Sequence, residues 1–262
     1  MWSTLIRFAI VLISVALNAS QPNYTNFSIS SRIVGGEPVT NNQIPWQVAL
    51  LYGGSLVCGG SIISPYWVVT AAHCILANAH FTVRAGSIFH QKNGQIRKSK
   101  SIIIHKRFNI ETMDNDIALI RLDLPFIFDK AVQPCRLAEF RRNSPLKVVV
   151  SGWGLTNENA TTLSNYLMMA KVSIVTPSEC QKAYGEIKIT KNMICAVDPN
   201  KDSCSGDSGG PLFFGNELIG IVSFGIGCAR SDYPGVYTSV SGFNLWIKRK
   251  ISELDGSRPT FS

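Results

Sequence analysis

The stretch Asp202-Ser203-Cys204-Ser205-Gly206-Asp207-Ser208-Gly209-Gly210-Pro211 places a candidate nucleophile, Ser208, among glycines. A serine hydroxyl is a weak nucleophile at neutral pH, so Ser208 needs a base and an orienting carboxylate from elsewhere in the chain. Glycine tolerates unusual backbone angles, which would let the amides of Gly206 and Ser208 converge on one point and stabilise an oxyanion there. For this stretch alone, a Gly/Ser-rich surface turn is an equally good interpretation, because short motifs arise often by chance.

Two further motifs supply a histidine and a carboxylate. His73 ends the run Thr70-Ala71-Ala72-His73 and lies beside Cys74, and Asp116 stands at the head of the apolar run Ile117-Ala118-Leu119-Ile120. Taken singly, His73 fits a hydrogen-bonded core histidine and Asp116 fits a strand-end cap. Their occurrence together with Ser208 favours nucleophilic catalysis.

The N-terminal region reads as targeting and processing sequence. Residues 1–20 carry Arg7, an apolar run at residues 8–17 and small residues at the end, which is typical of a secretory signal peptide. The run is shorter than the roughly 20 residues that span a bilayer, so we expect a secreted, extracellular protein with no membrane anchor. Residues 21–32 are polar and read as a pro-segment, and Arg32 directly precedes Ile33-Val34-Gly35-Gly36.

Glycosylation is expected at three Asn-X-Ser/Thr sequons. Asn23 and Asn26 lie in the pro-segment, and Asn159 lies in a polar region beyond Trp153.

The seven cysteines predict disulfides in a secreted chain, and there is neither a CxxC pair nor a His-rich cluster to favour a metal site. We therefore expect no metal and no cofactor. Cys135 is left over, either as a free thiol or as a link to another molecule. The spacing suggests three local pairs, although spacing does not prove connectivity: Cys58 with Cys74, Cys180 with Cys195, and Cys204 with Cys228.

The charge is strongly asymmetric. The chain has 25 Lys and Arg against 17 Asp and Glu, and residues 38–110 contain no acidic residue. A solvated face is the simpler interpretation of this positive region, and a site for an anionic glycan or an acidic protein segment is the alternative. Secretion and the lack of a binding motif disfavour nucleic acid. The basic residues expected on this face are Arg84, Lys92, Arg97, Lys98, Lys100, Lys106 and Arg107.

Short β-rich runs dominate the remaining pattern and favour an all-β antiparallel barrel or sandwich. With 262 residues, 45% of them hydrophobic, the chain can form one large all-β domain or two small barrels. One apolar stripe predicts a single long helix over residues 241–253, packed as a cap. The expected strands are residues 47–52, 61–63, 67–70, 81–85, 101–105, 117–122, 147–151, 167–173, 211–214, 218–224 and 235–238.

From residue 33 to about residue 254, the sequence resembles the chymotrypsin and trypsin family of serine endopeptidases. The resemblance implies two six-stranded antiparallel β-barrels, with the catalytic groups in the cleft between them, and a C-terminal α-helix. The three-bridge cysteine pattern resembles that of invertebrate trypsins. The motifs that carry the resemblance are Ile33-Val-Gly-Gly, Cys58-Gly-Gly-Ser with Trp67 and Ala-Ala-His73-Cys74, Asn115-Asp116-Ile-Ala-Leu, Gly152-Trp153-Gly154, Gly206-Asp-Ser208-Gly-Gly-Pro211 and Pro234-Gly-Val-Tyr237.

The resemblance also implies the catalytic roles, which are those of the Ser-His-Asp triad for which this family is the standard case. Ser208 would attack the scissile carbonyl, His73 would carry the proton, and Asp116 would orient His73. The amides of Gly206 and Ser208 would form the oxyanion hole.

Activation and specificity follow from the same resemblance. Cleavage after Arg32 would release an ammonium group at Ile33, which would pair with Asp207 and order the site. Asp202 would select Arg or Lys from the floor of the substrate pocket. The other residues implied to bind substrate are Ser203, Ser223, Phe224, Gly225 and Gly235, with Met113 and Tyr184 at adjoining subsites. No calcium is expected, because residues 86–104 lack carboxylates.

We therefore expect residues 33–262 to form the protease domain of a secreted, monomeric, zymogen-derived serine endopeptidase that cuts protein or peptide substrates after Arg or Lys. An activating trypsin-like protease and protein inhibitors are the expected partners, and digestion and limited processing stay open as roles. The alternative from another class is a non-catalytic protease homologue that binds anionic partners through its basic face.

Overall fold

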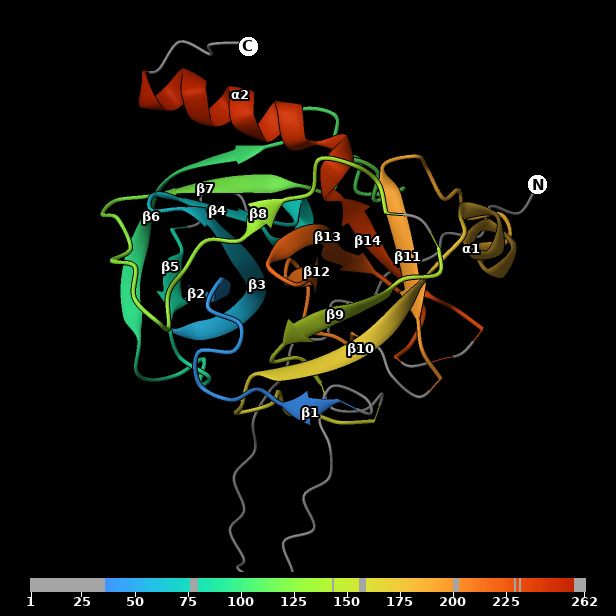
Figure 1. The fold of residues 1–262 in the computed structure, drawn as a ribbon, viewed down its shortest axis with the longest axis horizontal. Coiled ribbons are helices and arrows are strands. Elements are labelled where there is room, and N and C mark those ends of the chain that lie inside the picture. The colour runs from blue at the N-terminus through green and yellow to red at the C-terminus, as the bar shows by residue number, and fades with distance from the viewer. Residues whose placement is uncertain are drawn as a thin grey trace, which may run out of the picture. The chain divides into compact units, whose positions relative to one another are not determined.

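The computed structural model describes residues 36–75, 80–142, 144–155, 159–199, 203–228, 230 and 232–256. The expected signal peptide and pro-segment, with Asn23, Asn26, Arg32 and Ile33, lie outside these residues, as does Asp202. The described chain forms two closed six-stranded antiparallel barrels, which confirms the expected fold class (Figure 1).

The first barrel closes in the order β2-β3-β4-β7-β6-β5. Its core is apolar because β2 and β4 are buried along nearly their whole length, and Trp67 at the start of β4 is fully buried. Its strands are β2 (Gln47–Tyr52), β3 (Ser55–Ser64), β4 (Trp67–Thr70), β5 (Thr82–Ala85), β6 (Gln95–Ile104) and β7 (Ala118–Leu122).

The second barrel follows the order β9-β10-β11-β14-β13-β12 and closes because β12 pairs with β9. Two short strands extend it: β1 (Glu37–Pro38) pairs with β10, and β8 (Arg136–Leu137) runs parallel to β13. Its own strands are β9 (Lys147–Gly152), β10 (Met168–Val175), β11 (Met193–Val197), β12 (Pro211–Phe214), β13 (Glu217–Phe224) and β14 (Gly235–Ser239).

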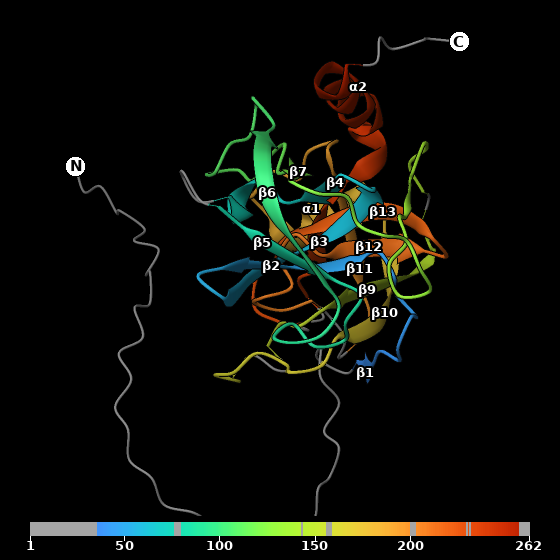
Figure 2. The ribbon, with the colours of Figure 1, turned by 90° about the vertical axis from the view of Figure 1, so that its left-hand side faces the viewer.

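The C-terminal helix α2 (Asn244–Asp255) follows the 3-10 turn η2 (Val240–Gly242) and lies over the first barrel, although it follows the last strand of the second (Figures 1 and 2). The indole Nε1 of Trp67 donates to Asp255 Oδ2 at 2.9 Å, and Arg121 pairs with the same carboxylate at 3.1 Å. The predicted packing helix thus ties the two barrels together. Neither described helix is long and apolar enough to cross a membrane.

A second helix, α1 (Pro177–Tyr184), was not predicted from the sequence. Its start carries a capping box, in which Thr176 accepts from the amide of Glu179 and the Glu179 side chain bonds back to Thr176. The spacing Thr-Pro-X-Glu was a usable signal. Strand β11 was also missed, and β3 and β6 begin six residues earlier than expected.

The structure contains the three disulfides that spacing suggested: Cys58–Cys74, Cys180–Cys195 and Cys204–Cys228. Cys135 is a free, buried thiol that donates to the carbonyl of Ile62 at 3.3 Å. Burial raises its pKa to about 12. Of the two alternatives for Cys135, this geometry favours the free thiol.

Candidate active site

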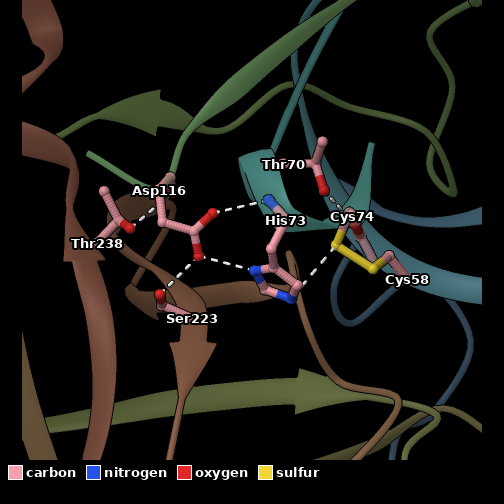
Figure 3. A network of polar contacts seen from close by, with 8 residues as sticks. Cys58, Thr70, His73, Cys74, Asp116, Ser223 and Thr238 are labelled. Atoms are coloured by element: carbon pink, nitrogen blue, oxygen red, sulfur yellow. Dashed lines mark hydrogen bonds and ion pairs between the residues drawn. A yellow bond between two sulfur atoms is a disulfide. The ribbon is translucent and has the colours of Figure 1, made fainter. Parts of the chain in front are cut away.

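Asp116 is fully buried immediately before β7, and three donors meet its carboxylate (Figure 3). Oδ1 accepts from the main-chain N–H of His73 at 2.9 Å, and Oδ2 lies 2.8 Å from His73 Nδ1. The hydroxyl of Ser223, on the second barrel, donates to Oδ2 at 2.6 Å. Thr238 on β14 holds the main chain, because its hydroxyl donates to the carbonyl of Asp116 at 2.7 Å. A buried carboxylate is thereby fully hydrogen-bonded.

These contacts determine the tautomer of His73. A carboxylate only accepts hydrogen bonds, so Nδ1 carries the proton and Nε2 keeps its lone pair available. His73 lies in the 3-10 turn η1 (Ala72–Cys74), where the bridge from Cys74 to Cys58 fixes the backbone. The ring is therefore oriented with Nε2 away from Asp116, 3.9 Å from the disulfide sulfur of Cys74 (Figure 3).

The segment around Ser208 is docked against the chain that leads to His73. The carbonyl of Ser208 accepts from the amide of Gly59 at 2.7 Å. At Gly209, φ is +76°, and a Cβ there would lie 2.2 Å from Thr70 Oγ1, so only glycine allows this approach. No hydrogen bond joins His73 Nε2 to Ser208 Oγ in the described structure, and such contacts often tighten only once substrate is bound.

Two main-chain donors are left free in the same loop. The amides of Asp207, Gly209 and Gly210 all have carbonyl acceptors, whereas within the described residues those of Gly206 and Ser208 have none. Unpaired donors beside a nucleophile are what an oxyanion hole requires. Gly206 has a φ of +98°, and a Cβ at this position would come within 2.6 Å of the Leu163 side chain.

Asp207, directly before Ser208, is completely buried. Its Oδ1 accepts from the amide of Gly154 at 2.8 Å and its Oδ2 from the amide of Cys204 at 2.9 Å. A Cβ at Gly152 would lie 2.0 Å from Oδ1, so the Gly-Trp-Gly motif makes room for this carboxylate. Burial raises the pKa of Asp207 to about 6, although the two amide donors act in the opposite direction.

A cavity of about 200 Å³ opens beside Ser208. At Gly225, an added Cβ would meet only the carbonyl oxygen of Gly227, at 3.8 Å, so packing does not require glycine at this position. The absence of a side chain there leaves the cavity open. The Cys204–Cys228 bridge joins the loop of Ser208 to the opposite wall. The lining residues are Ser203, Cys204, Ser205, Ser208, Val222, Ser223, Phe224, Gly225, Gly227, Cys228 and Gly235.

Comparison with known proteins agrees with this geometry. The sequence model of the family Trypsin matches residues 33–247. Trypsin alpha of Drosophila melanogaster is 39% identical over 250 residues, which cover 93% of this chain and 97% of the fly protein. The chain belongs to the trypsin family.

Other members of the trypsin family match over similar lengths. The vitellin-degrading protease of Bombyx mori is 39% identical over 259 residues, 96% of each chain. The solved structure of neuropsin, a serine protease expressed in the limbic system of mouse brain, has a TM-score of 0.79 and 35% identity, and covers 82% of this chain and 98% of that one. The protein is therefore a trypsin-like serine endopeptidase, a hydrolase of peptide bonds in protein or peptide substrates.

Within this trypsin-like site, the structure brings together residues that are far apart in the sequence. His73 and Asp116 come from the first barrel, and the loop of Ser208 comes from the second. Met113 and Tyr184, expected at adjoining subsites, do not line the cavity beside Ser208. The five described residues that the resemblance placed in the substrate pocket itself do line it: Ser203, Ser223, Phe224, Gly225 and Gly235.

One subsite expectation is wrong. Tyr184 is buried, with its hydroxyl donating to the carbonyl of Pro234 at 2.8 Å and its ring packed against Phe224 and Tyr233. It supports the cavity wall from behind and does not line an open subsite. An aromatic residue at the end of a short, unrecognised helix gave no sign of which side it would face.

The basic face also differs from expectation. Arg84 and Arg97 turn back onto the protein, where Arg84 donates to carbonyls of the loop 86–94 and Arg97 donates to the carbonyl of Pro125. Lys92 lies over the ring of Phe89. The exposed members of the predicted set are Lys92, Lys98, Lys100, Lys106 and Arg107.

Sequence reasoning missed several residues that build the site. Thr238 holds the backbone of Asp116, and Val222 and Gly227 complete the cavity. Thr238 lies inside an ordinary strand pattern, which carries no local signal of a contact to a residue more than 100 positions away.

Proposed function

We propose that this trypsin-family protein is secreted as a zymogen, activated by cleavage after Arg32, and cuts peptide bonds after Arg or Lys through an acyl-enzyme. The observation that carries the catalytic assignment is the buried carboxylate of Asp116, which bonds both the main chain and Nδ1 of His73. This pair orients the imidazole through Nδ1, so Nε2 is the nitrogen that would take the proton of Ser208.

In the proposed reaction, Ser208 Oγ attacks the scissile carbonyl carbon while its proton passes to His73 Nε2. The carbonyl oxygen becomes an oxyanion that the free amides of Gly206 and Ser208 stabilise. Collapse of the tetrahedral intermediate breaks the C–N bond, and the proton on His73 leaves with the amine. Water then repeats the sequence on the acyl-enzyme and restores Ser208.

The proposed specificity rests on the cavity beside Ser208. Its volume is about 200 Å³ and the position of Gly225 leaves it open, so a long side chain can enter. Asp202 lies in the sequence directly before Ser203, which lines the cavity, and a carboxylate there would select a cation because an unpaired buried charge is costly. Arg and Lys are the side chains that meet both requirements.

The proposed activation rests on Asp207. Among the described residues, main-chain amides are the only partners of this buried carboxylate, so its charge is incompletely compensated, which the raised pKa reflects. An ammonium group released at Ile33 would complete its partners and stabilise the adjacent oxyanion loop. This gives a physical reason for the chain to be inactive before cleavage after Arg32.

Partners and modification follow as further proposals. Protein inhibitors would enter the same cleft as substrates, and a trypsin-like protease would cut after Arg32. Asn159 is exposed and suited to glycosylation. The exposed part of the basic face, Lys92, Lys98, Lys100, Lys106 and Arg107, is the proposed contact for anionic glycans or acidic protein segments. Digestion and limited processing stay open as roles.

The test uses the secreted chain cut after Arg32, assayed with aminomethylcoumarin substrates that end in Arg, Lys or Phe. We expect turnover of the Arg and Lys substrates only, and labelling of the protein by a fluorophosphonate. Ser208→Ala should abolish both, whereas Ser55→Ala, at an exposed position of β3, should change neither. Labelling retained in Ser208→Ala would refute the nucleophile assignment, and equal turnover of the Phe substrate would refute the specificity.

A further inference from the structure

The second barrel binds three consecutive residues of the first barrel just before β7. Asp114 Oδ1 accepts from the hydroxyl of Thr190 at 2.7 Å and from Nδ2 of Asn192 at 2.9 Å. Asn192 Nδ2 also lies 3.3 Å from Asn115 Oδ1. Asp116 is the third residue, bonded by the hydroxyls of β13 and β14 described above. Residues 114, 115 and 116 thus all contact the second barrel, and the catalytic carboxylate belongs to the last of the three.

The residues on either side of Asp114 both have positive φ angles. Asn115 has a φ of +57°, which asparagine tolerates, but Met113 has a φ of +54°, a region that a long side chain seldom adopts unless its surroundings hold it there. Asn115 Nδ2 adds bonds to Asp114 Oδ2 at 3.1 Å and to the carbonyl of Arg107 at 3.1 Å. Both oxygens of Asp114 are thus engaged, one across the barrels and one within the loop.

Thr190 and Asn192, which bond Asp114 from the second barrel, are themselves held by hydrogen bonds. Thr190 and Asn192 lie in the short turn before β11, where the amide of Asn192 donates to the hydroxyl of Thr190 at 3.2 Å. The carbonyl of Asn192 accepts from the amide of Ser239 at 2.8 Å, next to Thr238. Asp114 is therefore anchored to the same strand, β14, that holds the backbone of Asp116.

We propose that Asp114 is a positioning residue for catalysis, which bonds Thr190 and Asn192 and so keeps the Asp116–His73 pair of the first barrel in register with Ser208 on the second. This inference rests on the proposed function, because it assigns no chemistry of its own to Asp114. Its effect comes from geometry, since a misplacement of about 1 Å in a catalytic group costs about 100-fold in rate.

The first experiment measures kcat and KM of Asp114→Ala on a single-residue arginine ester, which has no residues to occupy neighbouring subsites. We expect kcat to fall at least tenfold with KM changed less than threefold. The pair Thr190→Val and Asn192→Leu should reproduce the loss, and adding Asp114→Ala to that pair should cost little more, because all three changes break one contact. Asp114→Asn keeps an oxygen at Oδ1 and should recover most of the rate.

The matched control is Glu111→Gln, which removes one negative charge from an exposed position of the same loop. It should leave kcat unchanged. An unchanged kcat in Asp114→Ala, a loss confined to KM, or an equal loss in Glu111→Gln would overturn the proposal.

The second experiment does not depend on turnover. In a Ser208→Ala background, proton NMR follows the hydrogen-bonded Nδ1–H of His73, whose resonance should broaden or shift when Asp114→Ala is added and stay unchanged with Glu111→Gln. An unperturbed resonance in the folded Asp114→Ala protein would overturn the positioning role. If the wild-type chain turned over no substrate, the proposed function would fail, and this measurement would still decide the role of Asp114.

Discussion

The hydroxyl of Ser223 lies 2.6 Å from Asp116 Oδ2, the same oxygen that faces His73 Nδ1, and Ser223 also lines the cavity beside Ser208. One residue of the second barrel thus contacts both the buried carboxylate and the space where substrate is proposed to bind. This relationship couples the position of the proposed base to the wall of the specificity cavity.

Ser223→Ala should therefore reduce catalysis more than stability. A hydrogen bond to a charged group contributes about 1.5–3 kcal/mol, so kcat/KM should fall about 10- to 100-fold as Asp116 loses one of three donors. Steady-state kinetics on an arginine substrate measures this, with Ser173→Ala on β10 as the control. A kcat/KM within twofold of wild type would show that Asp116 is held well enough by its other partners.

The elements that sequence reasoning recovered are those with local signals. His73, Asp116 and Ser208 stand in short motifs of distinctive residue types, and the amphipathic stripe of α2 is visible without any partner. The missed residues act through long-range pairing: Thr238 and Asn192 meet the 114–116 segment only because two barrels pack together. The direction in which a buried side chain faces could not be predicted either. Nothing in the sequence near Tyr184 shows whether it lines the cavity or packs behind the residues that do.

Gly206→Ala should disable the oxyanion site. The added Cβ would lie 2.6 Å from Leu163 Cδ2 and 3.0 Å from the Cα of Gly154, and alanine is also strained at a φ of +98°. Displacing one oxyanion donor costs about 3 kcal/mol, so kcat should fall by two to three orders of magnitude. Active-site titration and kcat on an ester substrate measure the effect.

The control for Gly206 is Gly215→Ala in the β12–β13 turn. Gly215 also has a positive φ, +60°, but a Cβ there meets nothing within 4 Å. It should lower stability slightly through backbone strain and leave kcat unchanged. Equal losses of kcat in the two variants would mean that strain, and not the oxyanion donor, explains the result.

Arg84 should stabilise the loop 86–94 without any metal ion. Its Nε donates to the carbonyl of His90 at 3.1 Å, its Nη2 to the carbonyl of Gln91 at 3.2 Å, and its Nη1 to the carbonyl of Asn93. Arg84→Met should lower the free energy of unfolding by about 2 kcal/mol, or Tm by about 5 °C. Lys100→Met on neighbouring β6 should have no such effect, and EDTA should leave the Tm of the wild type unchanged. A fall in Tm with EDTA would contradict this account.

Asp207 should make the uncut chain less stable as pH rises through weakly acidic values. Its pKa in the folded protein is about 6 against an ordinary 3.8. Below about pH 3 the group is protonated in both states and has no effect. Between about pH 3 and 6 the unfolded chain ionises while the folded chain largely keeps its proton, so the free energy of unfolding falls by about 3 kcal/mol in total and stays lowered above pH 6.

Urea unfolding of the Ser208→Ala chain at pH 4, 5, 6 and 7, with and without Asp207→Asn, isolates this contribution, because other carboxylates cancel in the difference between the two proteins. In the uncut chain, Asp207→Asn should become relatively more stable by about 2 kcal/mol from pH 4 to 7. After cleavage at Arg32, the ammonium of Ile33 should lower the pKa of Asp207 and abolish or reverse that trend, since the ionised carboxylate then has its cation. The same pH dependence before and after cleavage would mean that the new terminus does not reach Asp207.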